Sequence, residues 1–297
     1  MHWKGSNFQS YWATSAELLF QYHKLEKGLC MPGEKRFFGE DPVKATLSLL
    51  GKWESLGFST EDPIYKGAIE TLRAYRHRLD ETPCKSGDDL GGTLDASSRL
   101  NGEPDHSLQT PIIVRQEIDP TVFPALEKLA DARRSVRSFK PATVPSEIIQ
   151  RAISIAQQCP SACNRQPTRI HVYTERERID ALLKLQNGNR GFGHTIPVLL
   201  LVTSEARCFF DASERNEPYL DAGLFVMSLL FALRAQGVSS CCLNWCVEPS
   251  NDTMAHKIGD IADSEKIITY IAVGYAEDGA LAPRSPRRSI DQILVQH

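Results

Sequence analysis

Two short segments are the most informative part of this chain: the first reads Arg133-Arg134-Ser135-Val136-Arg137-Ser138-Phe139, and the second reads Pro160-Ser161-Ala162-Cys163-Asn164-Arg165-Gln166-Pro167. The first places three arginines and a hydroxyl within five residues, and guanidinium groups bind phosphate through paired N–H donors. The second is a turn composition that offers backbone and amide groups to a flat polar ring. Together they indicate a ligand with an anionic end and a planar, hydrogen-bonding end.

Each segment alone is a weak signal, because arginine-rich stretches are more often solvated faces with ordinary ion pairs than ligand sites. A further basic stretch, Arg287-Arg288, lies in the C-terminal tail. The two segments and this tail together favour a bound anion. Flavin mononucleotide (FMN) carries a phosphate at one end and a hydrogen-bonding ring at the other, so it is the ligand that we expect.

Composition excludes several classes of protein. The 297 residues suffice for one large domain or two modest ones, and the hydrophobic share of 41% allows a sizeable core. A net charge of -3 with mixed signs gives no reason to expect nucleic acid or a membrane as partner. The first residues lack the apolar core of a signal peptide, and the longest apolar run, 196–202, is strand-sized. We therefore expect a cytoplasmic protein.

The eight cysteines are expected to be reduced thiols. Cys159 and Cys163 are four residues apart, and Cys242 and Cys246 repeat that spacing, so a zinc or iron–sulfur site is conceivable. Pro160 interrupts the first pair and no CxxC motif occurs, so we predict buried thiols and no metal. A redox role for Cys163, Cys241 or Cys242 is left open.

Three zones follow one another along the chain. Residues 1–79 form a helical region in which we expect helices over 11–27, 42–52 and 63–79, the first of them ended by Gly28. Residues 80–118 read as a polar linker that buries little apolar surface. Residues 119–297 form the compact part, where strands alternate with helices.

Within residues 119–297 the pattern predicts an α+β fold with a mixed central sheet flanked by helices. The run 196–202 is continuously apolar, which is typical of a strand covered on both faces. The helix expected over 219–236 is apolar nearly all round, so it should lie in the core or in a subunit interface. Residues 1–79 add an N-terminal helical extension to this fold.

Residues 125–294 resemble the nitroreductase-like family of FMN-dependent oxidoreductases. The resemblance rests on the order of four features: the arginine segment, the Pro160 turn, an apolar helix around Asp221-Ala222-Gly223, and the basic tail. It implies a homodimer with two FMN sites at the dimer interface. Thr168-Arg169 departs from the family, because many members carry an aromatic residue after Gln166-Pro167.

By position, the resemblance assigns roles around the FMN. It implies phosphate and ribityl contacts from Arg133, Arg134, Ser135, Arg287 and Arg288. Arg137 would be the cation beside the pyrimidine ring and would stabilise the negative charge that develops there. The partner subunit would supply Pro160, Ser161, Ala162 and Asn164. The pyrimidine edge would also meet Asn189 and Arg190, and the reactive edge would meet backbone N–H groups of Leu243 and Asn244. No side chain is assigned as a dedicated acid, base or nucleophile.

The implied activity is a ping-pong reaction in which NADH or NADPH reduces FMN and a small organic acceptor then oxidises it. Two alternatives stay open. The chain could run another FMN reaction, such as oxidative tailoring, dehalogenation or flavin breakdown. It could also be a non-catalytic flavin-binding or scaffold protein, which the additional helical zone and the long linker would suit.

Overall fold

The structure, a computed structural model, describes residues 9–32, 37–81, 90–114 and 117–297. The chain divides into two compact units. The first consists of Met1–Asp119, Pro160–Thr168 and Ser204–Asp221, and the second of Pro120–Cys159, Arg169–Thr203 and Ala222–His297. The first unit therefore combines the N-terminal region with two segments from the second half of the sequence.

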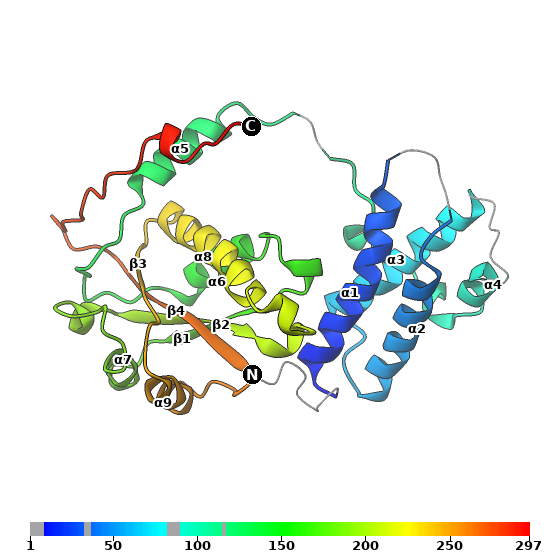
Figure 1. The fold of residues 1–297 in the computed structure, drawn as a ribbon, viewed down its shortest axis with the longest axis horizontal. Helices are drawn as coiled ribbons and strands as arrows, with labels where there is room; N and C mark the ends of the chain where they lie inside the picture. Colours follow the sequence, from blue (N-terminus) through cyan, green and yellow to red (C-terminus); the bar gives the residue numbers. More distant parts are fainter. Residues whose placement is uncertain (1–8, 33–36, 82–89, 115–116) are drawn as a thin grey trace. The chain divides into compact units, whose positions relative to one another are not determined.

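Three long helices build the core of the first unit: α1 (Tyr11–Cys30), α2 (Glu40–Ser55) and α3 (Pro63–Asp80), which are blue to cyan in Figure 1. Their apolar faces meet in a buried cluster that includes Leu18, Leu25, Leu50, Trp53 and Leu72. All three helices were predicted from their apolar spacing, and the structure confirms them with slightly longer bounds.

Helix α1 does not end at Gly28 as expected. A Cβ atom at residue 28 would lie 2.0 Å from a ring atom of Phe38, so glycine is required there for close packing. The helix continues to Cys30, and the Met31 N–H donates to the Gly28 carbonyl at its end. This glycine marks a tight contact between α1 and the chain that leads into α2.

The segment expected to be a surface linker partly packs against the first unit. It contains α4 (Leu90–Asp95) and the short 3-10 helices η1 (Ser98–Asn101) and η2 (His106–Leu108). Leu90 and Leu94 are buried in the same core as the long helices. The expectation of little apolar burial is wrong here, because two leucines four residues apart share one face of a short helix.

The second unit contains a four-stranded sheet in the order β1-β2-β4-β3. Its strands are β1 (Thr168–Tyr173), β2 (Val198–Glu205), β3 (Ser239–Leu243) and β4 (Glu265–Gly274). Strands β3 and β4 are antiparallel, with Ser239 opposite Gly274, while Ser135 forms a parallel bridge to Ser240. The sequence-predicted α+β architecture is confirmed.

Helices cover both faces of this sheet (Figure 1). Val198, Leu200 and Val202 pack with α6 (Ser146–Ala156) and α8 (Glu217–Ala235), whereas Leu199 and Leu201 pack with α7 (Arg176–Leu183) and α9 (Pro249–Gly259). Alternate residues of β2 thus enter two separate cores. This explains the continuous apolar run that the sequence shows.

Within the described residues, the stretch Ala212–Ala235, which contains α8, is long and apolar enough to cross a membrane by length and composition. Core helices pass the same test, and α8 packs Leu229 and Leu233 into the core against the sheet. The described part of the chain also contains α5 (Val122–Ala132) and the short helices η4 (Gly193–Thr195) and η7 (Ile290–Gln292).

Candidate functional site

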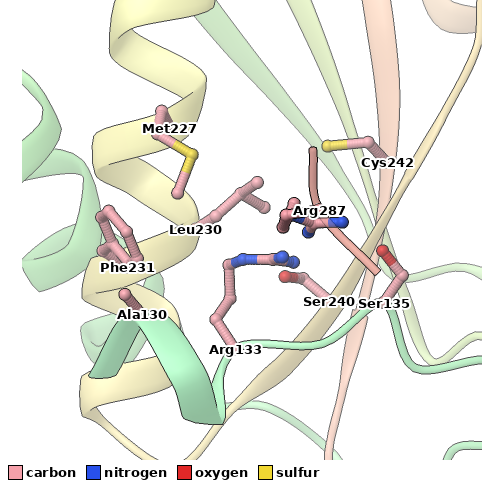
Figure 2. Close-up of a pocket in the computed structure, with 9 residues that line it drawn as sticks. All are labelled: Ala130, Arg133, Ser135, Met227, Leu230, Phe231, Ser240, Cys242 and Arg287. Atoms are coloured by element: carbon pink, nitrogen blue, oxygen red, sulfur yellow. The ribbon is translucent and has the colours of Figure 1, made fainter. Parts of the chain in front are cut away.

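A pocket of about 410 Å³ lies in the second unit where α5, α8, β3 and the C-terminal tail meet (Figure 2). Ligand pockets commonly have volumes of about 300–1,000 Å³. One wall is apolar and comes mainly from α8, and the opposite wall is polar. The lining residues are Ala130, Arg133, Ser135, Met227, Leu230, Phe231, Ser240, Cys242 and Arg287. We call this cavity the anion pocket, because Arg133 and Arg287 line it.

The backbone brings the polar wall together from three parts of the sequence. Helix α5 ends at Ala132, and the extended backbone of Arg133 then turns the chain toward the sheet. The Val136 N–H then donates to the Ser240 carbonyl at 3.1 Å, so Ser135 lies beside Ser240. The two-residue period of β3 places Ser240 and Cys242 on the pocket side.

Arg133 and Arg287 both bring positive charge to the anion pocket. Within the described residues, neither Arg133 nor Arg287 pairs with a carboxylate; Arg287 donates to the Ser285 carbonyl at 2.7 Å. By contrast, Arg134 pairs with Asp131 at 2.8 Å. Figure 2 shows the Arg133 and Arg287 side chains converging beside the two serines. Two guanidinium groups and two hydroxyls are a donor set that suits a phosphate.

The two neighbouring thiols on β3 have raised pKa values. Desolvation of the sulfur raises the pKa of Cys242 to about 11 although the residue is partly open to solvent, and the charge of Arg133 opposes this shift. Burial likewise raises the pKa of Cys241, against the opposing charge of Arg137. Both side chains are therefore thiols rather than thiolates near neutral pH, which weakens the case for a nucleophilic or redox role.

Arg137 and Arg288, which were predicted to contact FMN, do not line the anion pocket. Arg137 is exposed and donates to the Ser135 carbonyl at 3.3 Å. Arg288 is exposed in the tail. The roles that the sequence assigns to both residues stay predictions.

A buried glutamine joins the segment of Asn189 and Arg190 to the end of β3, where Leu243 and Asn244 lie. Gln186 is 4% exposed, and its amide nitrogen donates to the Asn244 carbonyl at 3.0 Å. The Asn189 amide donates to the Gln186 side-chain oxygen at 2.9 Å. A second pocket of about 410 Å³, lined in part by Gln186, Arg190 and Asn251, lies against this network. Nothing in the sequence singles out Gln186, because Asn244 lies 58 residues away.

The Pro160 turn belongs to the first unit. Its centre is η3 (Ala162–Asn164), and the Gln166 N–H donates to the Ser161 hydroxyl at 3.1 Å. The Ala162 N–H donates to both carboxylate oxygens of Asp221, at 3.1 and 3.2 Å. Burial raises the pKa of Asp221 to about 6, even though the Ala162 hydrogen bond lowers it.

Sequence reasoning missed several residues of these sites. Ser240 could have been found, because it shares a strand face with Cys242. Asp221 was noted as part of a motif, and an acid at the start of an apolar helix is a signal for a buried hydrogen-bond acceptor.

Within the described residues, no group of three His, Cys, Asp or Glu side chains is placed to hold a metal ion.

Comparisons with known proteins match the part of the chain that contains most of the anion pocket. The sequence model of the "Nitroreductase family" matches residues 130–187 and 180–275. Nitroreductase NfnB of Mycolicibacterium smegmatis is 24% identical over 215 residues, which are 57% of this chain and 91% of that protein. The 4-nitrobenzoate reductase of Pseudomonas putida is 25% identical over 202 residues, 50% of this chain and 84% of that protein. The crystal structure of a nitroreductase family protein from Streptococcus pneumoniae aligns with a TM-score of 0.51 and 23% identity, and the alignment covers 58% of this chain and 100% of that one.

Proposed function

The chain belongs to the nitroreductase family through residues 130–275, and we propose that it is an FMN-dependent enzyme that uses NADH or NADPH to reduce a small organic acceptor. The family match confirms the resemblance of residues 125–294 to the nitroreductase-like family. The cofactor, the electron donor and the acceptor are what we propose. The observation that carries this proposal is that Arg133 and Arg287 both line the anion pocket and that neither has an acidic partner among the residues that the structure describes.

The residues of the anion pocket fit the phosphate of FMN. Arg133 and Arg287 would pair with its oxygens, and Ser135 and Ser240 would donate hydroxyl hydrogen bonds. Arg134 would act beside them, although its ion pair with Asp131 leaves it less free for a ligand. The apolar wall from α8 would exclude water from one side of this contact and so strengthen it.

The remaining assignments concern the flavin ring. We assign Arg137 to the pyrimidine edge, where a fixed cation stabilises negative charge as it develops. Gln186 would hold the loops of Asn189 and Asn244 at a set distance beside the ring. When bound, FMN supplies the hydride chemistry, and the protein contributes position and charge.

We further propose that the active form is a homodimer. Helix α5 has no buried residue, and Val122, Phe123 and Leu126 on it are exposed. Leu224 and Met227 on α8 are exposed as well. Apolar side chains gathered in this way mark an interaction surface, and a second copy of the chain would cover them. Size-exclusion chromatography with light scattering should give twice the chain mass of 33.2 kDa.

The proposed function is tested on the purified protein. We expect a flavin absorbance spectrum, or uptake of added FMN, and loss of the yellow colour when NADH or NADPH is added without oxygen. Protein that neither contains nor binds FMN would refute the proposal. Protein that binds FMN but responds to neither nucleotide would instead be a flavin-binding protein without this activity.

The acceptor is tested in a second step. Because the two relatives are by name a nitroreductase and a 4-nitrobenzoate reductase, 4-nitrobenzoate is the first probe. We expect its addition to the bleached protein, still without oxygen, to restore the flavin spectrum. If the colour returns only with air, the acceptor belongs to another chemical class.

A further inference from the structure

We propose that the N-terminal helices hold the 160–166 turn in the conformation that binds FMN, through a contact chain from Phe20 on α1 to Phe210 to Arg165. This inference rests on the proposed function only in that the turn is taken to bind flavin. The contact chain itself lies wholly within the first compact unit. It gives a role to a region that the family match does not cover.

The 160–166 turn has a conformation that needs external support. Cys163, Asn164 and Gln166 all have left-handed backbone angles, with φ of 50°, 55° and 50°. Residues other than glycine pay about 1–2 kcal/mol for this region, and asparagine pays less than most. Three such residues within four positions persist only where surrounding contacts fix them. The fraction of molecules that hold the turn in this conformation therefore depends on contacts with neighbouring residues.

Arg165 supplies much of that support from inside the turn. Its side chain is 1% exposed, and its Nε donates to the Ala162 carbonyl at 3.0 Å. The same guanidinium donates to the Cys208 carbonyl at 2.8 Å and pairs with both oxygens of Glu214, at 2.5 and 3.1 Å. The turn is thus tied to the segment that holds the short helices η5 (Ala206–Cys208) and η6 (Ala212–Glu214).

Helix α1 packs against that segment. The Phe20 and Phe210 rings meet edge to face with centroids 4.8 Å apart, and the Arg165 guanidinium lies 4.6 Å from the Phe210 ring centre. Ala16 and Trp12 pack with Cys208 and Phe209 one to two turns earlier on the same helix. Helix α1 also contacts η3 itself. The N-terminal helices therefore reach the turn directly and through Arg165.

Removal of the Phe20 ring tests the contact chain. Phe20→Ala should leave the backbone of the turn less restrained, so that a smaller fraction of molecules holds the binding conformation. If this fraction falls to a tenth, the apparent Kd for FMN rises about tenfold. We expect this rise in a titration that follows the quenching of FMN fluorescence. Phe20→Tyr, which keeps the ring, should restore the affinity.

A matched control separates this role from general stability. Phe58 is another half-buried phenylalanine of the first unit, and it packs edge to face on Tyr11 and Trp53 rather than on Phe210. Phe58→Ala should lower the melting temperature about as much as Phe20→Ala but leave the Kd for FMN unchanged. Equal losses of affinity in the two variants would overturn the proposal.

Hydrogen–deuterium exchange in the FMN-free protein gives a readout that does not depend on the cofactor. Amides of the peptide that covers residues 160–166 should exchange faster in Phe20→Ala than in the wild type and in Phe58→Ala. Unchanged exchange would refute the contact chain even if FMN binds. Faster exchange in a protein that never binds FMN would support the contact chain and refute only the proposed function.

Discussion

Arg133 and Arg165 belong to the two segments that define the chain, and the structure gives them opposite surroundings. Arg133 is half-buried in the anion pocket and has no carboxylate partner among the described residues. Arg165 is buried and donates to a carboxylate and two carbonyls. A cation that the protein leaves without an acidic partner is available to a ligand, whereas one that the protein fully pairs maintains a conformation.

The energetics of the two arginines differ for the same reason. A buried ion pair contributes little net stability, but removal of one partner leaves an uncompensated charge and costs about 3–5 kcal/mol. A half-buried cation keeps part of its hydration until an anion replaces it. Its removal should therefore cost the folded protein little and cost ligand binding much.

The largest expected effect is the loss of stability in Arg165→Ala. The substitution leaves the Glu214 carboxylate without the bidentate partner that helps to hold its pKa below the usual range despite burial. We expect the free energy of unfolding to fall by about 3–5 kcal/mol, as measured by urea denaturation. Lys66→Ala is the control, because it breaks the exposed pair with Glu61 in the same unit and should change stability far less. A small loss for Arg165→Ala would show that the buried pair can be replaced by water.

The next effect concerns affinity rather than stability. Arg133→Ala removes a charge-assisted contact worth about 1.5–3 kcal/mol, so the Kd for FMN should rise roughly 10- to 150-fold while the urea midpoint hardly moves. Arg287→Ala should behave in the same way. Arg134→Ala is the matched control, because Asp131 already occupies its guanidinium and a smaller loss is expected. Unchanged affinity in Arg133→Ala would place the phosphate elsewhere.

Much of the fold could be predicted from the sequence, because the signals are local. The run 196–202 and the period-two pattern of 170–172 correspond to β2 and β1, and prolines mark the starts of α3 and α9. The errors arose where a distant residue decides the outcome. Gly28 reads as a helix end until the Phe38 ring is seen against it, and the 80–118 segment reads as a linker until the cluster that buries Leu90 is known.

The residues of the candidate sites also differ in how far they can be predicted from the local sequence. Arg133 and Ser135 are recognisable because several basic and hydroxyl side chains fall within five consecutive residues. Arg165 stands in the quoted turn, yet its role depends on Cys208 and Glu214, which are 43 and 49 residues away. Gln186 is likewise defined by Asn244, 58 residues further on. A sequence shows the charges that gather locally, but not which of them the fold will neutralise.

The buried carboxylate of Asp221, which accepts a hydrogen bond from the turn, should make the free energy of unfolding depend on pH. This effect is of intermediate size. The pKa of Asp221 is about 6 in the folded chain against an ordinary 3.8, so the folded state binds more protons than the unfolded state between these values. This contribution to stability is present near pH 4 and is lost as the pH rises through 6. It amounts to about 2 kcal/mol between pH 4.5 and 7.5.

Asp221→Asn tests this contribution, since the amide oxygen can still accept from the Ala162 N–H. Relative to the wild type, the variant should gain about 2 kcal/mol of unfolding free energy when the pH rises from 4.5 to 7.5. Urea denaturation of both proteins at the two pH values measures the difference, and titrations common to both cancel. A constant difference would mean that Asp221 keeps an ordinary pKa in the folded chain.

The smallest effect reports whether Arg133 carries an unneutralised charge. That charge lowers the pKa of Cys242, which desolvation otherwise raises to about 11. Removal of the charge in Arg133→Ala should raise the thiol pKa further and slow alkylation of Cys242 by iodoacetamide at pH 8, by no more than about threefold at a partly solvated site. Mass spectrometry of the Cys242 peptide measures the rate. Cys246, which is exposed and does not line the anion pocket, provides the internal reference. Added inorganic phosphate should slow the wild type in the same direction and leave Arg133→Ala unaffected, since an anion in the pocket cancels the charge that the substitution removes. If neither phosphate nor the substitution changes the rate, the charge of Arg133 is already neutralised. Arg133 would then resemble the paired Arg165, and the contrast between the two arginines would be refuted.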